Sequence, residues 1–111
     1  MSTTRQNKVS RLIQKELGQI IQKNASVLFG GAFITVTMVR ISPDLSFAKV
    51  YLSILNPDKE AVLKIVQQNT SKVRKELGTL VRNQLRVVPN LSFYIDDSLE
   101  YAEKINDLLK K

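Results

Sequence analysis

The stretch from residue 71 to residue 96 constrains the fold more than any other part of the sequence. Apolar residues recur at helical spacing in its first half, and basic residues occupy the opposite arc. Pro89 cannot continue a helix, and it pushes Val88 toward an extended conformation. Apolar and polar residues then alternate from Leu91 to Asp96, as in a half-buried strand. The sequence therefore predicts a basic amphipathic helix that runs directly into a strand. The apolar side of this helix consists of Val73, Leu77, Leu80 and Val81, and the basic arc of Lys72, Lys75, Arg82 and Arg86.

The rest of the chain predicts the elements that surround this helix and strand. A helical pattern that starts near Asp58 is interrupted by Asn69-Thr70-Ser71, whose side chains compete for backbone hydrogen bonds. Two consecutive helices are therefore expected instead of one. The other expected elements are a helix at 4–23, a loop at 24–32, strands at 33–41 and 47–54 joined by a turn at 42–45, and a last helix capped by Asp97 or Ser98.

Length and composition limit the class of protein. A chain of 111 residues with 43% apolar content is expected to form a single domain, spanning residues 1–111. The order α-β-β-α-α-β-α indicates the α+β class, with helices that cover one face of a three-stranded sheet. The chain has no cysteine and no histidine, which excludes disulfides, thiolate metal sites and imidazole chemistry. It shows neither a membrane-spanning apolar run nor a signal peptide, so a soluble cytoplasmic protein is expected.

Positive charge is concentrated in two segments. The formal net charge is +7, which predicts a polyanionic partner, either nucleic acid or an anionic membrane surface. Residues 1–24 and 72–89 each carry five basic side chains and one acidic side chain, a net charge of +4, whereas residues 90–111 carry −2. This uneven distribution of charge favours docking of the protein on a polyanion in one orientation. Arg74 lies at the edge of the apolar stripe, where an internal hydrogen bond is as good an expectation as a phosphate contact. The candidate binding residues are Lys8, Arg11, Lys15, Lys72, Arg74, Lys75, Arg82 and Arg86.

An enzymatic site is not expected. Asp96-Asp97 is the only adjacent pair of carboxylates, and a magnesium site there would lack a third ligand. Helix capping is the better interpretation of this pair and of Ser98, which has no base nearby in the sequence. We therefore expect no catalytic residue, no metal, no cofactor and no small-molecule substrate.

Several stretches resemble one protein family, in the order in which they occur there. They are Lys8-Val9 through Ile21, Ser42 through Tyr51, Arg74-Lys75-Glu76-Leu77, Leu85 through Phe93, and Asp96-Asp97-Ser98. Together they resemble bacterial ribosome-binding factor A, and the order of elements resembles a type II KH domain. The chain departs from an ordinary KH domain in having no GxxG loop, and from the family in having Asn69-Thr70-Ser71 where an Ala-x-Gly kink is usual.

The resemblance implies a fold and a function. The fold would be a single type II KH-like RNA-binding domain with a three-stranded mixed sheet. The function would be that of a monomeric, non-enzymatic assembly factor. It would bind the immature small (30S) ribosomal subunit through 16S rRNA, assist late maturation and rRNA processing, and be most important at low temperature. The eight cations named above would then be its RNA-binding residues.

Two alternatives remain open. The outward strand positions Lys49, Tyr51 and Tyr94, beside Thr35 and Thr37, could stack RNA bases on the sheet, because aromatic side chains on a sheet can do so. Alternatively, the basic helix could dock on an acidic protein, which would make the chain a protein-interaction module.

Overall fold

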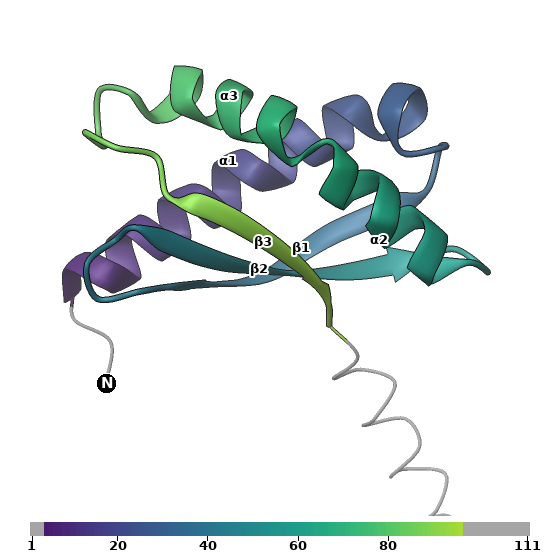
Figure 1. The fold of residues 1–111 in the computed structure, drawn as a ribbon, viewed down its shortest axis with the longest axis horizontal. Coiled ribbons are helices and arrows are strands. Elements are labelled where there is room, and N and C mark those ends of the chain that lie inside the picture. The colour runs from purple at the N-terminus through teal and green to yellow at the C-terminus, as the bar shows by residue number, and fades with distance from the viewer. Residues whose placement is uncertain (1–3, 97–111) are drawn as a thin grey trace, which may run out of the picture.

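The computed structural model describes residues 4–96, so the helix expected after Asp97 or Ser98 lies outside the described residues. The described part follows the expected order of elements and confirms the α+β class (Figure 1). The elements are α1 (Thr4–Leu28), β1 (Phe33–Ile41), β2 (Phe47–Leu55), α2 (Lys59–Gln68), α3 (Thr70–Val81) and β3 (Asn90–Ile95).

The sheet has the order β1-β2-β3 and is mixed, as expected. β1 pairs antiparallel with β2, whereas β2 pairs parallel with β3. The parallel pair requires a crossover connection, which α2 and α3 supply. The register of β1 shifts at Thr37, between Val36 and Met38. An extra residue at this point exchanges the two faces of the strand, so that Val36 and Val39 are both buried.

All three helices cover the same face of the sheet (Figure 1). The alternation in β2 follows from this arrangement. Ala48, Val50, Leu52 and Ile54 are buried beneath the helices, and the residues between them point to the uncovered face. The helices complete the core with Ile13, Leu17, Ile21, Val66, Val73, Leu77 and Val81.

Helix α1 is longer than expected, because the predicted loop at 24–32 begins only after Leu28. Asn24 was interpreted as a loop residue, but its Nδ2 donates to the carbonyl of Ile20 at 2.8 Å and to the carboxylate of Glu76 at 3.4 Å. The side chain therefore joins α1 to α3 and does not end the helix. The positive φ angles of 66° and 76° at Gly30 and Gly31 turn the chain into β1.

The junction of α2 and α3 confirms the two-helix interpretation of Asn69-Thr70-Ser71. Asn69 Nδ2 donates to the carbonyl of Ile65 at 2.8 Å, and Thr70 Oγ1 donates to the carbonyl of Gln67 at 2.7 Å. Both bonds go to carbonyls in the last turn of α2, where the helix leaves carbonyl groups without the usual helical partners, and they add to the backbone bond that Asn69 N–H makes to Ile65. Asn69 makes no side-chain capping bond to α3, so its side chain serves the end of α2 and not the start of the next helix.

Candidate nucleic-acid interface

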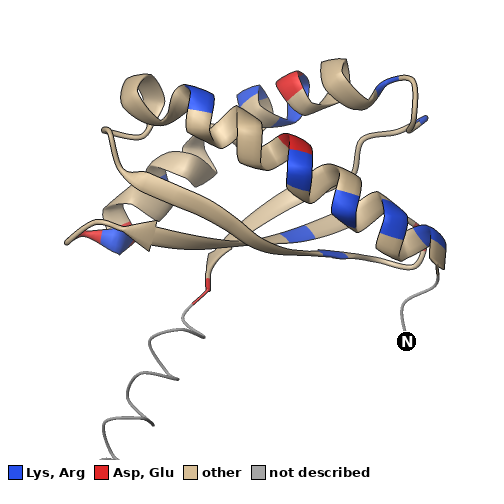
Figure 2. Cartoon of the chain, turned by 180° about the vertical axis from the view of Figure 1, so that it is seen from behind, with Lys and Arg blue, Asp and Glu red and all other residues tan. Residues whose placement is uncertain are grey.

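The first group of predicted cations lies on α1. Lys8, Arg11 and Lys15 are exposed, and they follow one another at spacings of three and four residues, which places them along one side of the helix. In Figure 2 the ribbon of α1 carries several blue bands toward its N-terminus. This exposed basic side of α1 belongs to residues 1–24, the first of the two segments with a net charge of +4.

The second group does not form a single arc on one helix. Helix α3 ends at Val81, and residues 82–89 form a loop, so the expected direct run into the strand was wrong. Lys72 and Lys75 are exposed on α3, Arg82 follows its end, and Arg86 lies within the loop. Leu80 was expected on the buried side but is 48% exposed. The helical spacing of Arg82 and Arg86 was therefore misleading.

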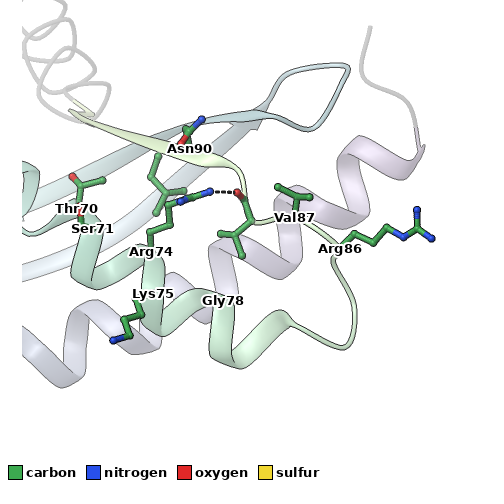
Figure 3. Close-up of a pocket in the computed structure, with 10 residues that line it drawn as sticks. Thr70, Ser71, Arg74, Lys75, Gly78, Arg86, Val87 and Asn90 are labelled. Atoms are coloured by element: carbon green, nitrogen blue, oxygen red, sulfur yellow. Dashed lines mark hydrogen bonds between the residues drawn. The ribbon is translucent and has the colours of Figure 1, made fainter.

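Arg74 explains why the chain before β3 is held as a loop. Its Nε donates to the carbonyl of Pro89 at 3.0 Å, and its Nη2 donates to the carbonyl of Val88 at 2.7 Å. Figure 3 shows the guanidinium directed at this segment. Two hydrogen bonds from a charged group to backbone carbonyls are individually strong. This geometry agrees with the internal alternative that the sequence left open for Arg74.

Helix α3 and the loop enclose a hollow of about 650 Å³ (Figure 3). Gly78 allows the loop to approach closely, because a Cβ at this position would lie 3.3 Å from Val88 Cγ2. Arg86 and Lys75 extend away from the hollow on different sides in Figure 3, so that their charged ends remain accessible. The lining includes Thr70, Ser71, Arg74, Lys75, Gly78, Arg86, Val87, Val88, Asn90 and Leu91.

A larger hollow, of about 950 Å³, lies where the start of α1, the β1–β2 turn and the loop meet. Lys8 and Arg86 both line it, although 77 positions separate them in the sequence. Arg5 also lines it and was missing from the predicted set, although it belongs to the same basic segment. Folding therefore brings the two basic segments together at one end of the molecule (Figure 2). Of the other predicted cations, Arg11 lines a separate hollow with Arg40. The hollows of about 650 and 950 Å³, called the two basic hollows below, are not lined by Lys15, Lys72 or Arg82.

Comparison with known proteins identifies the family. A family model for ribosome-binding factor A matches residues 5–109. The ribosome-binding factor A of Cytophaga hutchinsonii is 50% identical over 112 residues, which cover 100% of this chain and 84% of that protein. The chain belongs to the ribosome-binding factor A family. The corresponding protein of Flavobacterium johnsoniae is 44% identical over 114 residues, covering 98% of this chain and 85% of that protein.

Two sets of coordinates for ribosome-binding factor A from Thermus thermophilus share the fold. The crystal structure has a TM-score of 0.69 at 22% identity and covers 81% of this chain and 94% of that chain. A homology model of that protein was fitted into a cryo-electron microscopy map of its complex with the 30S subunit. It has a TM-score of 0.64 at 25% identity and covers 78% of this chain and 89% of that chain. The expected α+β fold with a three-stranded mixed sheet is thus confirmed.

Ribosome-binding factor A is a non-enzymatic assembly factor, as expected for this chain. Residues 4–96 contain no group of three acidic, cysteine or histidine side chains that could hold a metal. Asp96 accepts a hydrogen bond of 2.6 Å from Thr37 Oγ1, so this carboxylate fastens the end of β3 to the bulge of β1. Asp97 and Ser98 lie outside the described residues. No helix in the described part is long and apolar enough to cross a membrane.

The uncovered sheet face offers only a small platform for bases. The rings of Tyr51 and Tyr94 lie 5.7 Å apart, tilted by 32°, so they pack against each other. Lys49 is exposed on β2, two residues before Tyr51, and pairs with Ser92 of β3. Thr37, however, donates to Asp96 and to the carbonyl of Tyr51 and is engaged internally. This face therefore brings together fewer cations than the end of the molecule around Arg86.

Proposed function

We propose that this chain binds the immature small ribosomal subunit through 16S rRNA and assists its late maturation and rRNA processing in the bacterial cytoplasm. It acts as a monomer and matters most at low temperature. Membership of the ribosome-binding factor A family supports this proposal, as does the 30S complex of the Thermus thermophilus protein. The observation that carries the site is the meeting of two basic segments at one hollow, with Lys8 on one side and Arg86 on the other.

The proposed contact surface consists of exposed cations from α1, α3 and the loop after α3. Lys8, Arg11 and Lys15 contact phosphates from one side, and Lys72, Lys75, Arg82 and Arg86 contact them from the other. Phosphate contacts of this kind supply affinity and orientation without reading sequence. Arg74 contributes indirectly, because its bonds to Val88 and Pro89 hold the loop that carries Arg86.

Co-sedimentation with precursor small subunits tests this assignment. We expect the double variant Arg82→Glu and Arg86→Glu to lose most of its binding, while its thermal unfolding stays cooperative, because both side chains are exposed. The matched control is Lys23→Glu with Lys64→Glu, which changes the net charge equally at exposed positions outside both basic hollows. Equal loss in both variants would show a general charge effect and contradict the assigned surface. Binding that survives removal of the rRNA would favour an acidic protein partner instead.

A further inference from the structure

The hollow of about 950 Å³ beside Arg86 has the dimensions of a ligand site. Three separate parts of the chain enclose it: the first turns of α1, the β1–β2 turn and the loop that precedes β3. Its volume lies at the upper end of the range of about 300–1,000 Å³ that is typical of small-molecule pockets. Phosphate binding alone does not require a recess of this size. The residues that line the hollow therefore indicate which other part of a ligand could bind there.

The lining combines cations with an apolar wall. Arg5, Lys8 and Arg86 are exposed at the hollow and can hold one or more phosphates. Leu85, which is half-buried, forms apolar lining beside them, and Val87, which is 71% exposed, extends this surface outward. A flat aromatic base packs well on such a wall while its phosphate remains with the cations. Together these features match a nucleotide.

The β1–β2 turn adds an acceptor to this lining. Asp44 Oδ1 accepts from Ser42 Oγ at 2.7 Å, from Ser46 Oγ at 2.7 Å and from the backbone N–H of Ser46 at 3.1 Å. These bonds fix the carboxylate, and none of them uses Oδ2. They also lower the pKa of Asp44 to about 2, so that this group is an ionised acceptor at neutral pH. An ionised carboxylate only accepts hydrogen bonds and therefore selects a ligand edge that donates.

We propose that this hollow binds one unstacked guanine nucleotide of the folded ribosomal RNA, an inference that rests on the proposed function. The guanine packs against Leu85 and Val87, and Asp44 Oδ2 accepts from its N1–H and N2–H groups. The phosphates on either side of the nucleotide contact Arg5, Lys8 and Arg86.

The choice of guanine follows from the edges of the four bases. Guanine presents N1–H and N2–H side by side, and one carboxylate oxygen can accept from both. Uracil presents a single N3–H between two carbonyl oxygens, which the negative charge of Asp44 repels. Adenine and cytosine each place a ring nitrogen acceptor next to their amino group. Proteins read RNA sequence mostly at such unpaired bases in loops and bulges, where the Watson–Crick edge is accessible.

Binding of the full chain to two RNA hairpins that differ only in one bulged nucleotide tests the proposal. We expect the hairpin with bulged guanine to bind about fivefold more tightly than the hairpin with bulged uracil. Amide shifts in NMR spectra should centre on Ser46, Leu85 and Val87. Asp44→Asn should reduce the preference to less than about twofold, because the amide presents N–H groups as well as an oxygen. The matched control, Asp58→Asn, should retain the preference, since Asp58 caps α2 and does not line this hollow.

Three outcomes would overturn the inference: equal binding of the two hairpins, no measurable binding of the guanine hairpin, or shifts centred on Thr70 and Ser71 at the other hollow. Guanosine 5′-monophosphate serves as a further probe and should bind at least about tenfold more weakly than the guanine hairpin, because it lacks a second phosphate contact. If the free nucleotide bound more tightly than the guanine hairpin, the ligand of this hollow would be a soluble nucleotide and not ribosomal RNA. Equal hairpin binding alongside normal co-sedimentation with subunits would refute this inference alone, whereas failure of the wild-type chain to co-sediment would refute the proposed function.

Discussion

At the scale of single residues, Arg74 shows that a cation in a basic segment can serve the fold. Its guanidinium donates to the carbonyls of Val88 and Pro89, the residues that lead into β3. Pro89 is fully buried, so its carbonyl needs a partner from the protein. The sequence could place Arg74 at the edge of the apolar stripe, but a bond across 14 or 15 positions is set by tertiary structure.

Arg74→Met should therefore destabilise the protein by about 2 kcal/mol, because it leaves two backbone carbonyls without their charged donor. Arg74→Lys should recover part of this loss, since an ammonium group cannot reproduce the two-pronged guanidinium geometry. Urea unfolding measures both values. The control Lys75→Ala alters an exposed neighbour and should change stability by no more than about 0.5 kcal/mol. Equal effects of Arg74→Met and Lys75→Ala would show that the two bonds do not matter for stability.

The hydrogen bonds around Asp44 alter its ionisation. Hydrogen bonds from the Ser42 side chain, and then from the side chain and backbone of Ser46, lower its pKa from 3.8 to about 2. A lowered pKa in the folded state means that the ionised carboxylate favours folding at pH values above 3.8. This contribution disappears as the pH falls toward about 2. NMR titration of the Asp44 carboxyl carbon should give this low midpoint, and Ser42→Ala should raise it toward 3.8. An unchanged midpoint in that variant would mean that the Ser42 bond does not lower the pKa.

At the scale of elements, the junction of α2 and α3 takes the place of a glycine loop. Asn69 and Thr70 donate back to carbonyls of α2, so the break is held by side chains. No glycine lies between Gly31 and Gly78, and a phosphodiester cannot approach the backbone here as it does at a GxxG loop. This is consistent with binding through the side chains of α1, α3 and the loop.

Asn69→Ala should destabilise the protein by about 1 kcal/mol, through loss of the bond from Nδ2 to the Ile65 carbonyl. Ser71→Ala is the matched control and should remain within about 0.5 kcal/mol, because Ser71 is exposed at the start of α3. Thermal unfolding of both variants provides the comparison. If Ser71→Ala were the more costly change, the break would depend on the start of α3 and not on the end of α2.

The helices and strands could be predicted from the sequence wherever the apolar residues recur with one clear period, either helical or alternating. Alternation of apolar and polar residues predicts that Val50 and Leu52 share one face of their strand, and both are buried. The helix expected to start near Asp58 does begin there, and Asp58 accepts from the Ala61 N–H. The errors occurred where distant contacts decide the outcome. Asn24 lies within α1 and its side chain reaches Glu76 on α3. Helix α3 stops at Val81, and Arg74 holds the Val88 carbonyl in the loop that follows. The sequence predicted the charged side chains of the candidate site. It could not predict the two hollows, because these form only where segments that are distant in the sequence meet in the folded chain.

At the scale of the whole molecule, the fold converts two basic segments into one basic end. Lys8 from the start of α1 and Arg86 from the loop after α3 line the same hollow, and Lys75 and Arg86 line the next. Arg86 thus belongs to both hollows and lies at the centre of the proposed surface. A surface of this kind attracts a polyanion at long range and orients it on contact.

The salt dependence of binding to precursor small subunits follows from this arrangement. Each lysine or arginine that neutralises a phosphate releases counterions and adds about 0.7–0.9 to the slope of log K against log salt concentration. We expect a steep negative slope for the wild-type chain, and Arg86→Gln should make it shallower by about 0.7–0.9 because it removes one central contact. Lys64→Gln removes one exposed charge from α2, outside the basic end, and should leave the slope unchanged. A flat slope in the wild-type chain would mean that phosphate contacts do not provide the affinity. A steep slope that Arg86→Gln does not alter would place those contacts elsewhere on the molecule.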